Sequence, residues 1–281
     1  MSIADEIKRT YRQGGTLTRL LLINIGVFVA YGLVQLALFV AGSPANHAYT
    51  HLLAVPADLR QLLLHPWTLL TYMFFHEELF HIIFNMLWLW WFGQLFMQSH
   101  TGRQLRGVYL LGGLSGALLF ILAYNLLPAF NAHGAMALGA SASVMAVVFA
   151  VAVRHPNQPI GLLFIGTVRL KYLALATVLI DLVSIPASNA GGHIAHLGGA
   201  LFGFIFARQL AKGRDLSQLP FSRKQQAQAN SWPFGQQSKP KQTLSEQQLN
   251  QILDKISRSG YDSLSRAEKK ALFKFKDQSD A

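Results

Sequence analysis

The chain has 281 residues, of which 52% are hydrophobic and 13% are charged, and its formal net charge at pH 7 is +11. Soluble domains usually carry about a quarter charged residues, so this composition excludes an ordinary soluble protein and predicts one embedded in a membrane. Because the chain contains no Cys, disulfides, thiolate metal sites and a cysteine nucleophile are excluded as well.

The first 18 residues are polar and basic and do not read as a cleaved signal, because no small-residue cleavage pattern follows the next apolar stretch. We expect them to form a cytoplasmic N-terminal segment. Six hydrophobic stretches then approach the roughly 20 residues that a helix needs to span a bilayer. They lie at about 19–41, 79–98, 106–127, 138–153, 172–187 and 192–210.

The predicted fold is therefore all-α: a polytopic bundle of six transmembrane helices over residues 19–210. The fourth and fifth stretches are short, which is typical of central helices buried by their neighbours. The loop at 42–78 contains several prolines and a half-hydrophobic stretch at 59–64. We expect this loop to lie partly in the membrane interface rather than to cross the bilayer.

The basic residues indicate how the bundle is oriented. Arg60 stands in one of the alternate loops, beside acidic residues, whereas the other side holds Lys8, Arg9, Arg12, Arg19, Arg103, Arg106, Arg154, Arg169 and Lys171. By the positive-inside rule both termini are cytoplasmic. The second, fourth and sixth helices then run from the outer to the inner face, so their first residues lie at similar depth near the outer face.

Small residues mark where the helices are expected to touch. Gly112, Gly113 and Gly116 lie in the third stretch, and Gly199 and Gly203 lie in the sixth. Small residues four apart on a helix let two backbones approach closely. We therefore expect the sixth helix to press against the fourth.

The C-terminal part is expected to be separate from the bundle. Residues 211–243 are rich in Gln, Ser, Lys and Pro and predict a flexible linker. Capping boxes at Ser245 and Ser265 each indicate a helix start, and Gly260 indicates a helix end. A cytoplasmic two-helix extension over 244–278 is predicted, with apolar stripes at Leu249, Ile252, Leu253 and Ile256 and at Leu272 and Phe275.

Polar residues at the start of the second, fourth and sixth helices form the candidate site. Ser141 follows Gly139 and Ala140 and is a candidate nucleophile, because small neighbours let a carbonyl approach its hydroxyl. The first turn of its helix supplies unpaired N–H groups for an oxyanion. His196 is the candidate base. His81 and Asn85, four residues apart, share a helix face.

Each of these residues alone is more often a structural polar group than a catalytic one. Together at one depth they favour a site, since polar groups inside a bilayer are costly. Ser143 is a rival hydroxyl, but it lies about 200° around the helix from Ser141. His193 lies about 60° from His196 on the sixth helix.

This combination resembles the rhomboid family of intramembrane serine proteases, and the resemblance covers roughly residues 19–210. The matching motifs are His76-x4-His81-x3-Asn85 before an aromatic-rich helix, Gly139-Ala140-Ser141, and Ala195-His196 followed by Gly199-x3-Gly203. Two residues depart from the usual pattern. Ala142 replaces the second Gly of the common GxSG motif, and Met145 stands where an aromatic residue often packs on the catalytic His. Both changes are tolerable, because Ala is small and a thioether can pack on an imidazole.

The resemblance implies a Ser141–His196 dyad and an oxyanion hole formed by Asn85, His81 and the Ser141 backbone N–H. It also implies that the loop at 42–78 is laterally embedded and that the fifth helix is a movable gate for substrate entry. The expected substrates are single-span or polytopic membrane proteins, and the expected location is the plasma membrane of a bacterium. No cofactor, metal or nucleic acid is expected; the C-terminal extension is open to a partner or to self-association.

Four other interpretations remain. His76 and His81 are one residue too far apart for an HExxH zinc motif and would diverge by about 140° on a helix. Asp181, the one acid inside a hydrophobic stretch, either completes a triad or, as we favour, bonds a neighbouring helix or faces a water cavity. A proton-coupled transporter fits the number of helices but lacks a relay or a repeat. An inactive relative that binds membrane proteins for quality control is the main alternative to an enzyme.

Overall fold

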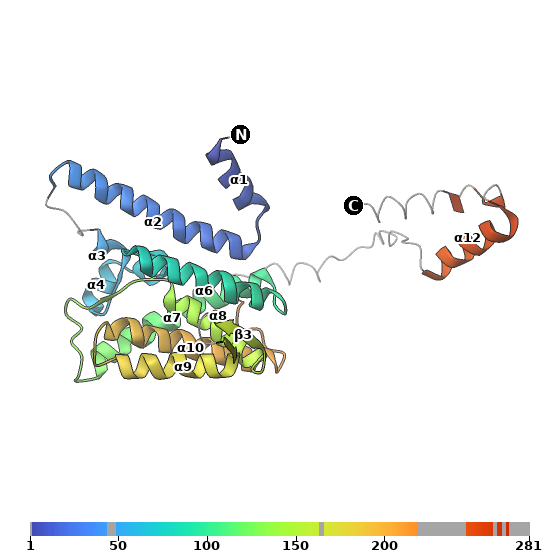
Figure 1. Cartoon of the computed structure of the whole chain (residues 1–281). Helices are drawn as coiled ribbons and strands as arrows, with labels where there is room; N and C mark the ends of the chain where they lie inside the picture. Colours follow the sequence, from blue (N-terminus) through green and yellow to red (C-terminus); the bar gives the residue numbers. More distant parts are fainter. Residues whose placement is uncertain are drawn as a thin grey trace, which may run out of the picture. The chain divides into compact units, whose positions relative to one another are not determined.

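The computed structural model describes residues 2–43, 49–162, 166–218, 246–260, 263–265 and 268–269. The chain divides into two compact units, Met1–Lys224 and Gln225–Ala281, which are described separately. The fold is that of a polytopic all-α membrane protein, as predicted from the composition and the hydrophobic stretches (Figure 1).

The first unit consists of helices joined by short strands and turns (Figure 1). Among its described residues are two antiparallel pairs of strands, in which Val55 faces Ala137 and Pro159 faces Arg169. In chain order the elements are α1 Ile3–Gln13, α2 Thr16–Val40, α3 Thr50–Leu53, β1 Val55–Pro56, α4 Leu59–Leu64, α5 Thr68–Thr71, the 3-10 helix η1 Tyr72–Phe74, α6 Leu79–Met97, α7 Gly102–Leu126, β2 Met136–Ala137, α8 Ser141–Arg154, β3 Pro159–Leu162, β4 Gly166–Arg169, α9 Leu170–Ser184 and α10 Ala190–Leu210.

Helices stand at all six predicted positions, with ends that differ from the prediction by a few residues. Four of them are long and apolar enough to cross a membrane, namely α2, α6, α7 and α10, and the protein is an integral membrane protein. With 14 and 15 residues, α8 and α9 are about 21–23 Å long at 1.5 Å per residue, which is less than the hydrocarbon thickness of about 30 Å.

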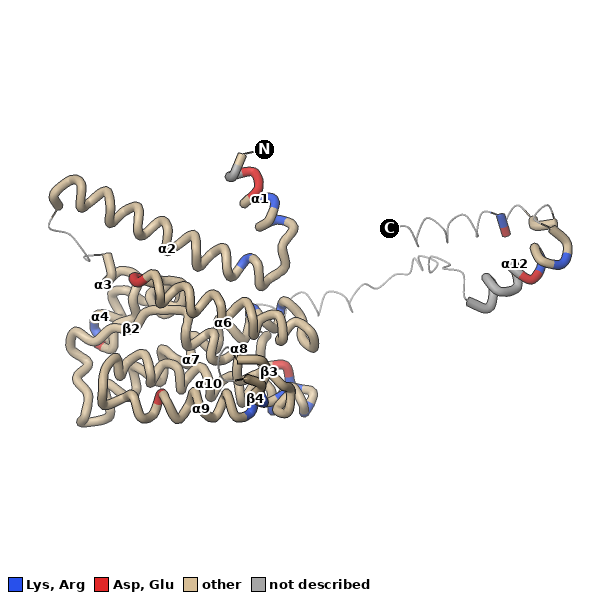
Figure 2. The backbone as a smooth tube through the Cα atoms, in the orientation of Figure 1, with Lys and Arg blue, Asp and Glu red and all other residues tan. Residues whose placement is uncertain are grey.

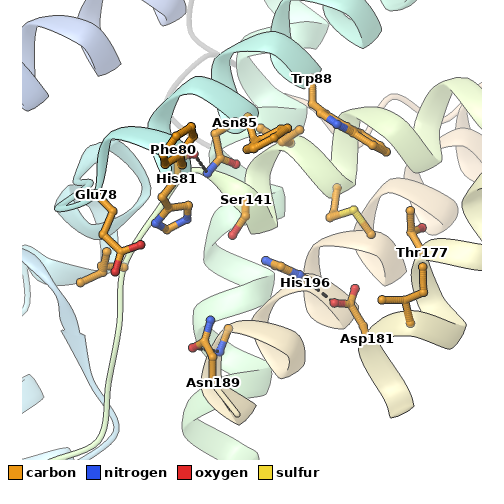
Figure 3. A pocket seen from close by; sticks show the side chains of 16 residues that line it. Glu78, Phe80, His81, Asn85, Trp88, Ser141, Thr177, Asp181, Asn189 and His196 are labelled. Atoms are coloured by element: carbon orange, nitrogen blue, oxygen red, sulfur yellow. Dashed lines mark hydrogen bonds and ion pairs between the residues drawn. The ribbon is translucent and has the colours of Figure 1, made fainter. Parts of the chain in front are cut away.

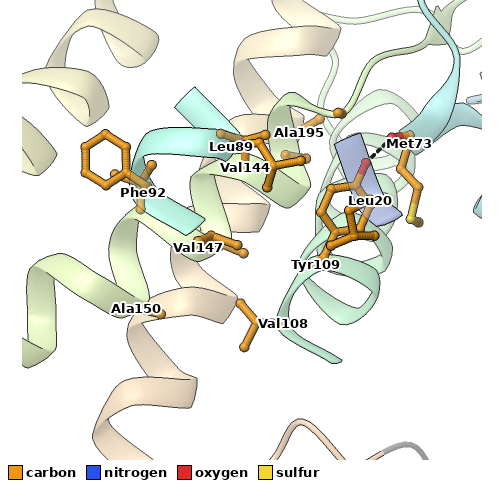
Figure 4. Packing of buried hydrophobic residues seen from close by; sticks show 14 of the residues in the cluster. Leu20, Met73, Leu89, Phe92, Val108, Tyr109, Val144, Val147, Ala150 and Ala195 are labelled. Atoms are coloured by element: carbon orange, nitrogen blue, oxygen red, sulfur yellow. Dashed lines mark hydrogen bonds between the residues drawn. The ribbon is translucent and has the colours of Figure 1, made fainter. Parts of the chain in front are cut away.

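The prediction that both short helices are buried is correct for α8 and wrong for α9. Nearly every residue of α8 from Ala142 to Ala152 is buried, and Val144, Val147 and Ala150 belong to one apolar cluster with residues of α6 and α7 (Figure 4). Of the residues of α9, all of which the structure describes, Leu170, Ala174 and Asp181 are buried. Most of the other residues of α9 are apolar, and exposed members such as Leu175, Leu179 and Val183 form a surface suited to lipid.

Glycines bring α10 against α8, as the small-residue pattern predicts. A Cβ atom added at Gly199 would lie 1.9 Å from the carbonyl oxygen of Ala142, and one added at Gly203 would lie 2.1 Å from that of Ala146. No side chain fits at such distances. The two backbones are therefore in direct contact, and this contact holds the start of α8 beside the first half of α10.

Charged residues divide the first unit into two ends. Figure 2 shows that Lys and Arg gather where α6 ends and where β3 and β4 lie, at the end that the basic residues predict to be cytoplasmic. The helix α4, which contains Arg60, lies at the opposite end (Figure 2). The helices α6, α8 and α10 all run from this second end toward the first (Figure 1), so the polar residues near their starts lie toward the same side of the bundle.

The described part of the loop at 42–78 is folded into α3, β1, α4, α5 and η1. Asp58 caps α4, because its side chain accepts hydrogen bonds from the backbone N–H groups of Arg60 and Gln61. The half-hydrophobic stretch at 59–64 forms this helix, in which Leu63 is 81% exposed and Leu64 is 71% exposed. Exposed leucines on a short helix fit the prediction that the loop lies in the membrane interface.

Residues at the start of the expected linker pack against α7. The side chain of Gln104 donates a hydrogen bond to Asp215. Ser217 is buried against Gly107: a Cβ atom added to Gly107 would lie 2.2 Å from the carbonyl oxygen of Ser217. The folded part of the first unit thus continues beyond α10, as far as Ser217, whereas the linker is predicted to begin at residue 211.

The second unit contains α12 Glu246–Ser259. As predicted, Gly260 ends this helix: it has a φ of +78°, and its N–H donates to the Ile256 carbonyl. Ser265 and Glu268 form the predicted capping box, in which each side chain accepts from the other residue's backbone N–H. Ser245, Leu272 and Phe275 lie outside the described residues, as do the side chains of Leu249 and Leu253.

Candidate active site

Ser141 is the first residue of α8, and the turn before it requires a glycine. Gly139 has a φ of +114°, which residues with a Cβ atom rarely adopt. A Cβ atom at this position would also lie 2.6 Å from the ring of His81. Gly139 thus lets the His81 imidazole approach the backbone just ahead of Ser141.

A second histidine holds this turn in place. The Ala140 N–H donates a hydrogen bond of 3.2 Å to Nε2 of His76, and the Gly139 N–H donates to the carbonyl of Tyr72. His76 is fully buried. Burial, with a contribution from nearby His81, lowers the pKa of His76 to about 4, so Nε2 can accept at neutral pH. Sequence reasoning named His76 as part of a motif but did not recognise it as the support of α8.

All four predicted site residues line one cavity of about 450 Å³ between α6, α8, α9 and α10. The Ser141 hydroxyl and the His196 imidazole point toward one another, and His81 and Asn85 extend from α6 toward the same space (Figure 3). Most of the remaining wall is apolar and comprises Phe80, Phe84, Trp88, Leu138, Val144, Met145, Ile180 and Gly192. Thr177 and Asn189 are its neutral polar members, and Glu78 and Asp181 are its acidic ones.

Asp181 of α9 contacts both histidines of α10 through one carboxylate oxygen. Oδ1 lies 2.9 Å from Nδ1 of His196 and 2.8 Å from Nδ1 of His193. Asp181 does bond a neighbouring helix, as we favoured, but one of its two partners is the candidate base, so it also stands where the less favoured triad would place it. The helical pattern of the sequence does not reveal this contact, because it depends on how α9 is placed against α10.

This contact fixes the tautomer of His196. An ionised carboxylate only accepts hydrogen bonds, so Nδ1 of His196 must donate its proton to Asp181. In the neutral imidazole, Nε2 then carries the lone pair. The arrangement leaves His196 with a free acceptor nitrogen, which a general base needs.

The other polar candidates are placed as follows. One N–H of the Asn85 side chain donates to the His81 carbonyl on its own helix, at 3.0 Å, so the amide is held at the cavity wall with one N–H left over. Ser143, the rival hydroxyl, is fully buried and is not among the residues that line the cavity. It lies on the α7 side, where a Cβ atom on Gly113 would be 2.6 Å from its Oγ.

The two departures from the usual motif also have a structural setting. Ala142 is buried between α7 and α10: a Cβ atom on Gly116 would lie 2.5 Å from its Cβ, and Gly199 touches its carbonyl. Its methyl group therefore occupies space left free by Gly116, while Gly199 makes room for its backbone carbonyl. Met145 lines the cavity, where its thioether replaces an aromatic wall.

Comparison with known proteins supports the same interpretation. The model of the Rhomboid domain matches residues 64–213, and a family of unknown function, DUF6576, matches residues 236–275. The relatives include RHOMBOID-like protein 12, mitochondrial, from Arabidopsis thaliana, which is 29% identical over 52% of this chain and 47% of its own length. Presenilin-associated rhomboid-like protein A, mitochondrial, from Danio rerio is 30% identical over 46% of this chain and 34% of its own length.

The chain thus spans less than half the length of these curated relatives. Both carry mitochondrial names, so the comparisons do not support the expected bacterial plasma membrane. The Rhomboid match extends over more than half of the chain and includes α6 to α10 with all four predicted site residues. The protein therefore belongs to the rhomboid family.

Proposed function

We propose that this protein is an intramembrane serine endopeptidase that cleaves transmembrane segments of membrane proteins, with Ser141 as nucleophile and His196 as general base. One observation carries the proposal: the Ser141 hydroxyl and the His196 ring point toward each other in a shared cavity, while Asp181 accepts from Nδ1 of the same ring. A nucleophile, a base and a group that orients the base are the parts that serine hydrolases use.

The reaction follows from this geometry. Ser141 Oγ attacks the scissile carbonyl carbon while its proton passes to Nε2 of His196. The C–N bond then breaks, and His196 returns that proton to the leaving amine, which leaves an acyl group on Ser141. A water molecule gives a proton to His196 and attacks the acyl carbon. The Oγ–C bond breaks, and Ser141 regains its proton as the new carboxyl end departs.

The negative charge that develops on the carbonyl oxygen needs donors already in place. The first turn of α8 leaves backbone N–H groups unpaired, and the free N–H of Asn85 lies on the α6 wall of the same cavity. The His81 ring, which packs on Gly139 just before Ser141, is the third proposed donor. These groups converge from α6 and α8 on one side of Ser141.

The proposed entrance for a substrate helix lies beside α9. This helix contributes Thr177 and Ile180 to the cavity wall, yet most of its surface is exposed and apolar. A weakly packed helix of this kind can shift sideways more readily than the buried α8. The apolar cavity wall suits the side chains of a transmembrane segment.

We place the cavity near the outer face of the membrane, because the basic residues lie at the other end of the bundle (Figure 2). Both termini are then on the cytoplasmic side. None of the residues that line the cavity belongs to the C-terminal unit, which matches a family of unknown function.

A cleavage assay tests the proposal. The full-length protein, purified in mild detergent, is incubated with a panel of transmembrane peptides, and the products are identified by mass spectrometry. The proposal predicts cleavage within or beside the apolar segment, with complete loss in Ser141→Ala and His196→Ala. A folded wild-type protein that binds these peptides and cleaves none of them would favour the binding-only alternative.

A further inference from the structure

A cluster of three potential metal ligands shares a wall with the proposed active site. Among the described residues, Asp181, His193 and His196 offer ligand atoms that all lie within 4.8 Å of one another. The Asp181 side chain is 7% exposed, whereas the His193 and His196 side chains are 19% and 24% exposed. The acid is thus buried, and the two imidazoles remain accessible to a small ion.

The donor set and its spacing suit Zn²⁺. Two imidazole nitrogens and a carboxylate oxygen are common zinc ligands. With bonds of about 2.0–2.2 Å, neighbouring ligands of a tetrahedral zinc ion are about 3.3 Å apart. The two Nδ1···Oδ1 distances of 2.8 and 2.9 Å need to lengthen by only about 0.5 Å to meet that spacing. Water from the cavity can occupy the fourth position.

We propose that Asp181, His193 and His196 form an inhibitory Zn²⁺ site. Its effect on catalysis rests on the proposed function. The metal would bind Nδ1 of both histidines and one oxygen of Asp181, in place of the two hydrogen bonds. The ligands come from α9 and α10, so the ion would also tie the proposed gate helix to the bundle.

Inhibition follows from the tautomer of His196. Without metal, the proton is on Nδ1 and the lone pair of Nε2 faces Ser141. A zinc ion on Nδ1 displaces that proton to solvent, and Nε2 takes one up from solvent to complete the neutral imidazole. No net proton is gained or lost by the ring. Nε2 then donates instead of accepting, and it cannot remove the proton from Ser141.

The metal site is tested first by binding, which does not depend on peptidase activity. Full-length Ser141→Ala is titrated with Zn²⁺ in competition with a chromophoric chelator, and one equivalent is expected to bind. Adding His193→Gln, which keeps a donor toward Asp181 but removes a ligand, should weaken binding by more than the roughly 10- to 100-fold that loss of an outer-shell partner costs. His133→Gln is the matched control, since His133 lies 3.8 Å from Asp58 without a second histidine, and it should leave binding unchanged. Equal zinc binding in the His193→Gln variant, or no binding at all, would overturn the site.

The tautomer change is tested by nitrogen NMR of the histidine rings in the same Ser141→Ala protein. The His196 resonance should report a proton on Nδ1 before zinc and on Nε2 after it. In the wild-type enzyme, Zn²⁺ should abolish peptide cleavage, a chelator should restore it, and His193→Gln should remain active and resist inhibition. An unchanged His196 tautomer would contradict the proposed switch. If the wild type cleaves nothing, the proposed function fails, while zinc binding and NMR still decide the metal site.

Discussion

Of the residues in the cavity, Asn85 has a proposed role that kinetics can distinguish from substrate binding. Its side chain is held by a hydrogen bond to the His81 carbonyl, and its second N–H is proposed to meet charge that exists only in the transition state. Loss of one oxyanion donor typically costs about 3–4 kcal/mol, or about two to three decades in rate. Asn85→Ala should therefore lower kcat far more than it raises KM. Steady-state kinetics on a model peptide measures both, and a change confined to KM would contradict the assignment.

His76 predicts how stability depends on pH. Burial lowers the pKa of this side chain from 6.5 to about 4, so the unfolded chain binds a proton at a higher pH than the folded one. Stability is therefore highest above about 6.5 and falls as the pH drops toward about 4, by at most about 3 kcal/mol from this group.

Thermal unfolding in detergent between pH 7 and pH 4 measures this slope in wild type and in His76→Gln. The Gln side chain can still accept a hydrogen bond from the Ala140 N–H but does not titrate. The stability of the His76→Gln variant should therefore fall less steeply with decreasing pH than that of the wild type, by the His76 contribution. Identical slopes in the two proteins would show that His76 does not hold the turn before Ser141 through a neutral imidazole.

That the four predicted site residues line one cavity was predictable from the sequence, because each stands near the start of a hydrophobic stretch and the three stretches cross the membrane in the same direction. The contacts that hold these residues in place were not predictable from the sequence. His76 precedes α6 and reaches Ala140 across a long stretch of sequence, and Asp181 lies near the end of a helix whose rotation no local pattern sets. Contacts of this kind depend on tertiary packing, which a single sequence does not encode in its periodicity.

At the scale of elements, the direct backbone contact between α8 and α10 keeps Ser141 beside His196. The contact needs glycine on α10, since any Cβ atom at Gly199 would overlap the Ala142 carbonyl. Hydrophobic length and small-residue spacing predicted both helices and their contact. The same signals misjudged α9, because a short apolar stretch has the same composition whether it faces neighbours or lipid.

Gly199→Ala should separate the two helices and lower both stability and activity. Forcing a methyl group into a packed interface typically costs about 1–3 kcal/mol. The matched control is Gly26→Ala in α2, where an added Cβ atom meets nothing within 4 Å and the better helix propensity of Ala should leave stability equal or slightly higher. Thermal unfolding and peptide cleavage are compared for the two variants; equal behaviour would mean that the α8–α10 contact does not position the dyad.

At the scale of the whole molecule, the proposed chemistry lies in the first unit, and the second unit has its own local order. α12 is joined to the following capping box by the Lys255–Glu268 ion pair, and Ile252 and Leu264 are buried. None of the residues that line the cavity belongs to the second unit. We propose that it acts in partner recruitment or self-association rather than in catalysis.

Truncation tests this division. Removal of residues 219–281 should leave cleavage of a detergent-solubilised peptide within a few-fold of full length. Truncation after Ala211 removes Asp215 and Ser217 as well, which pack on α7, and should lower the unfolding temperature further without removing a catalytic group. Complete loss of activity in a well-folded chain that ends at Gln218 would refute the separation of roles.

The central claim is that Ser141 is a nucleophile activated by His196, and labelling with a fluorophosphonate tests it most directly. The reagent is applied to the full-length protein in mild detergent, and the modified residue is located by peptide mass spectrometry. An adduct is predicted on Ser141 in wild type and in Ser143→Ala, with none in Ser141→Ala and little in His196→Ala. An adduct on Ser143, or an unlabelled Ser141 in a folded wild-type protein, would contradict the account.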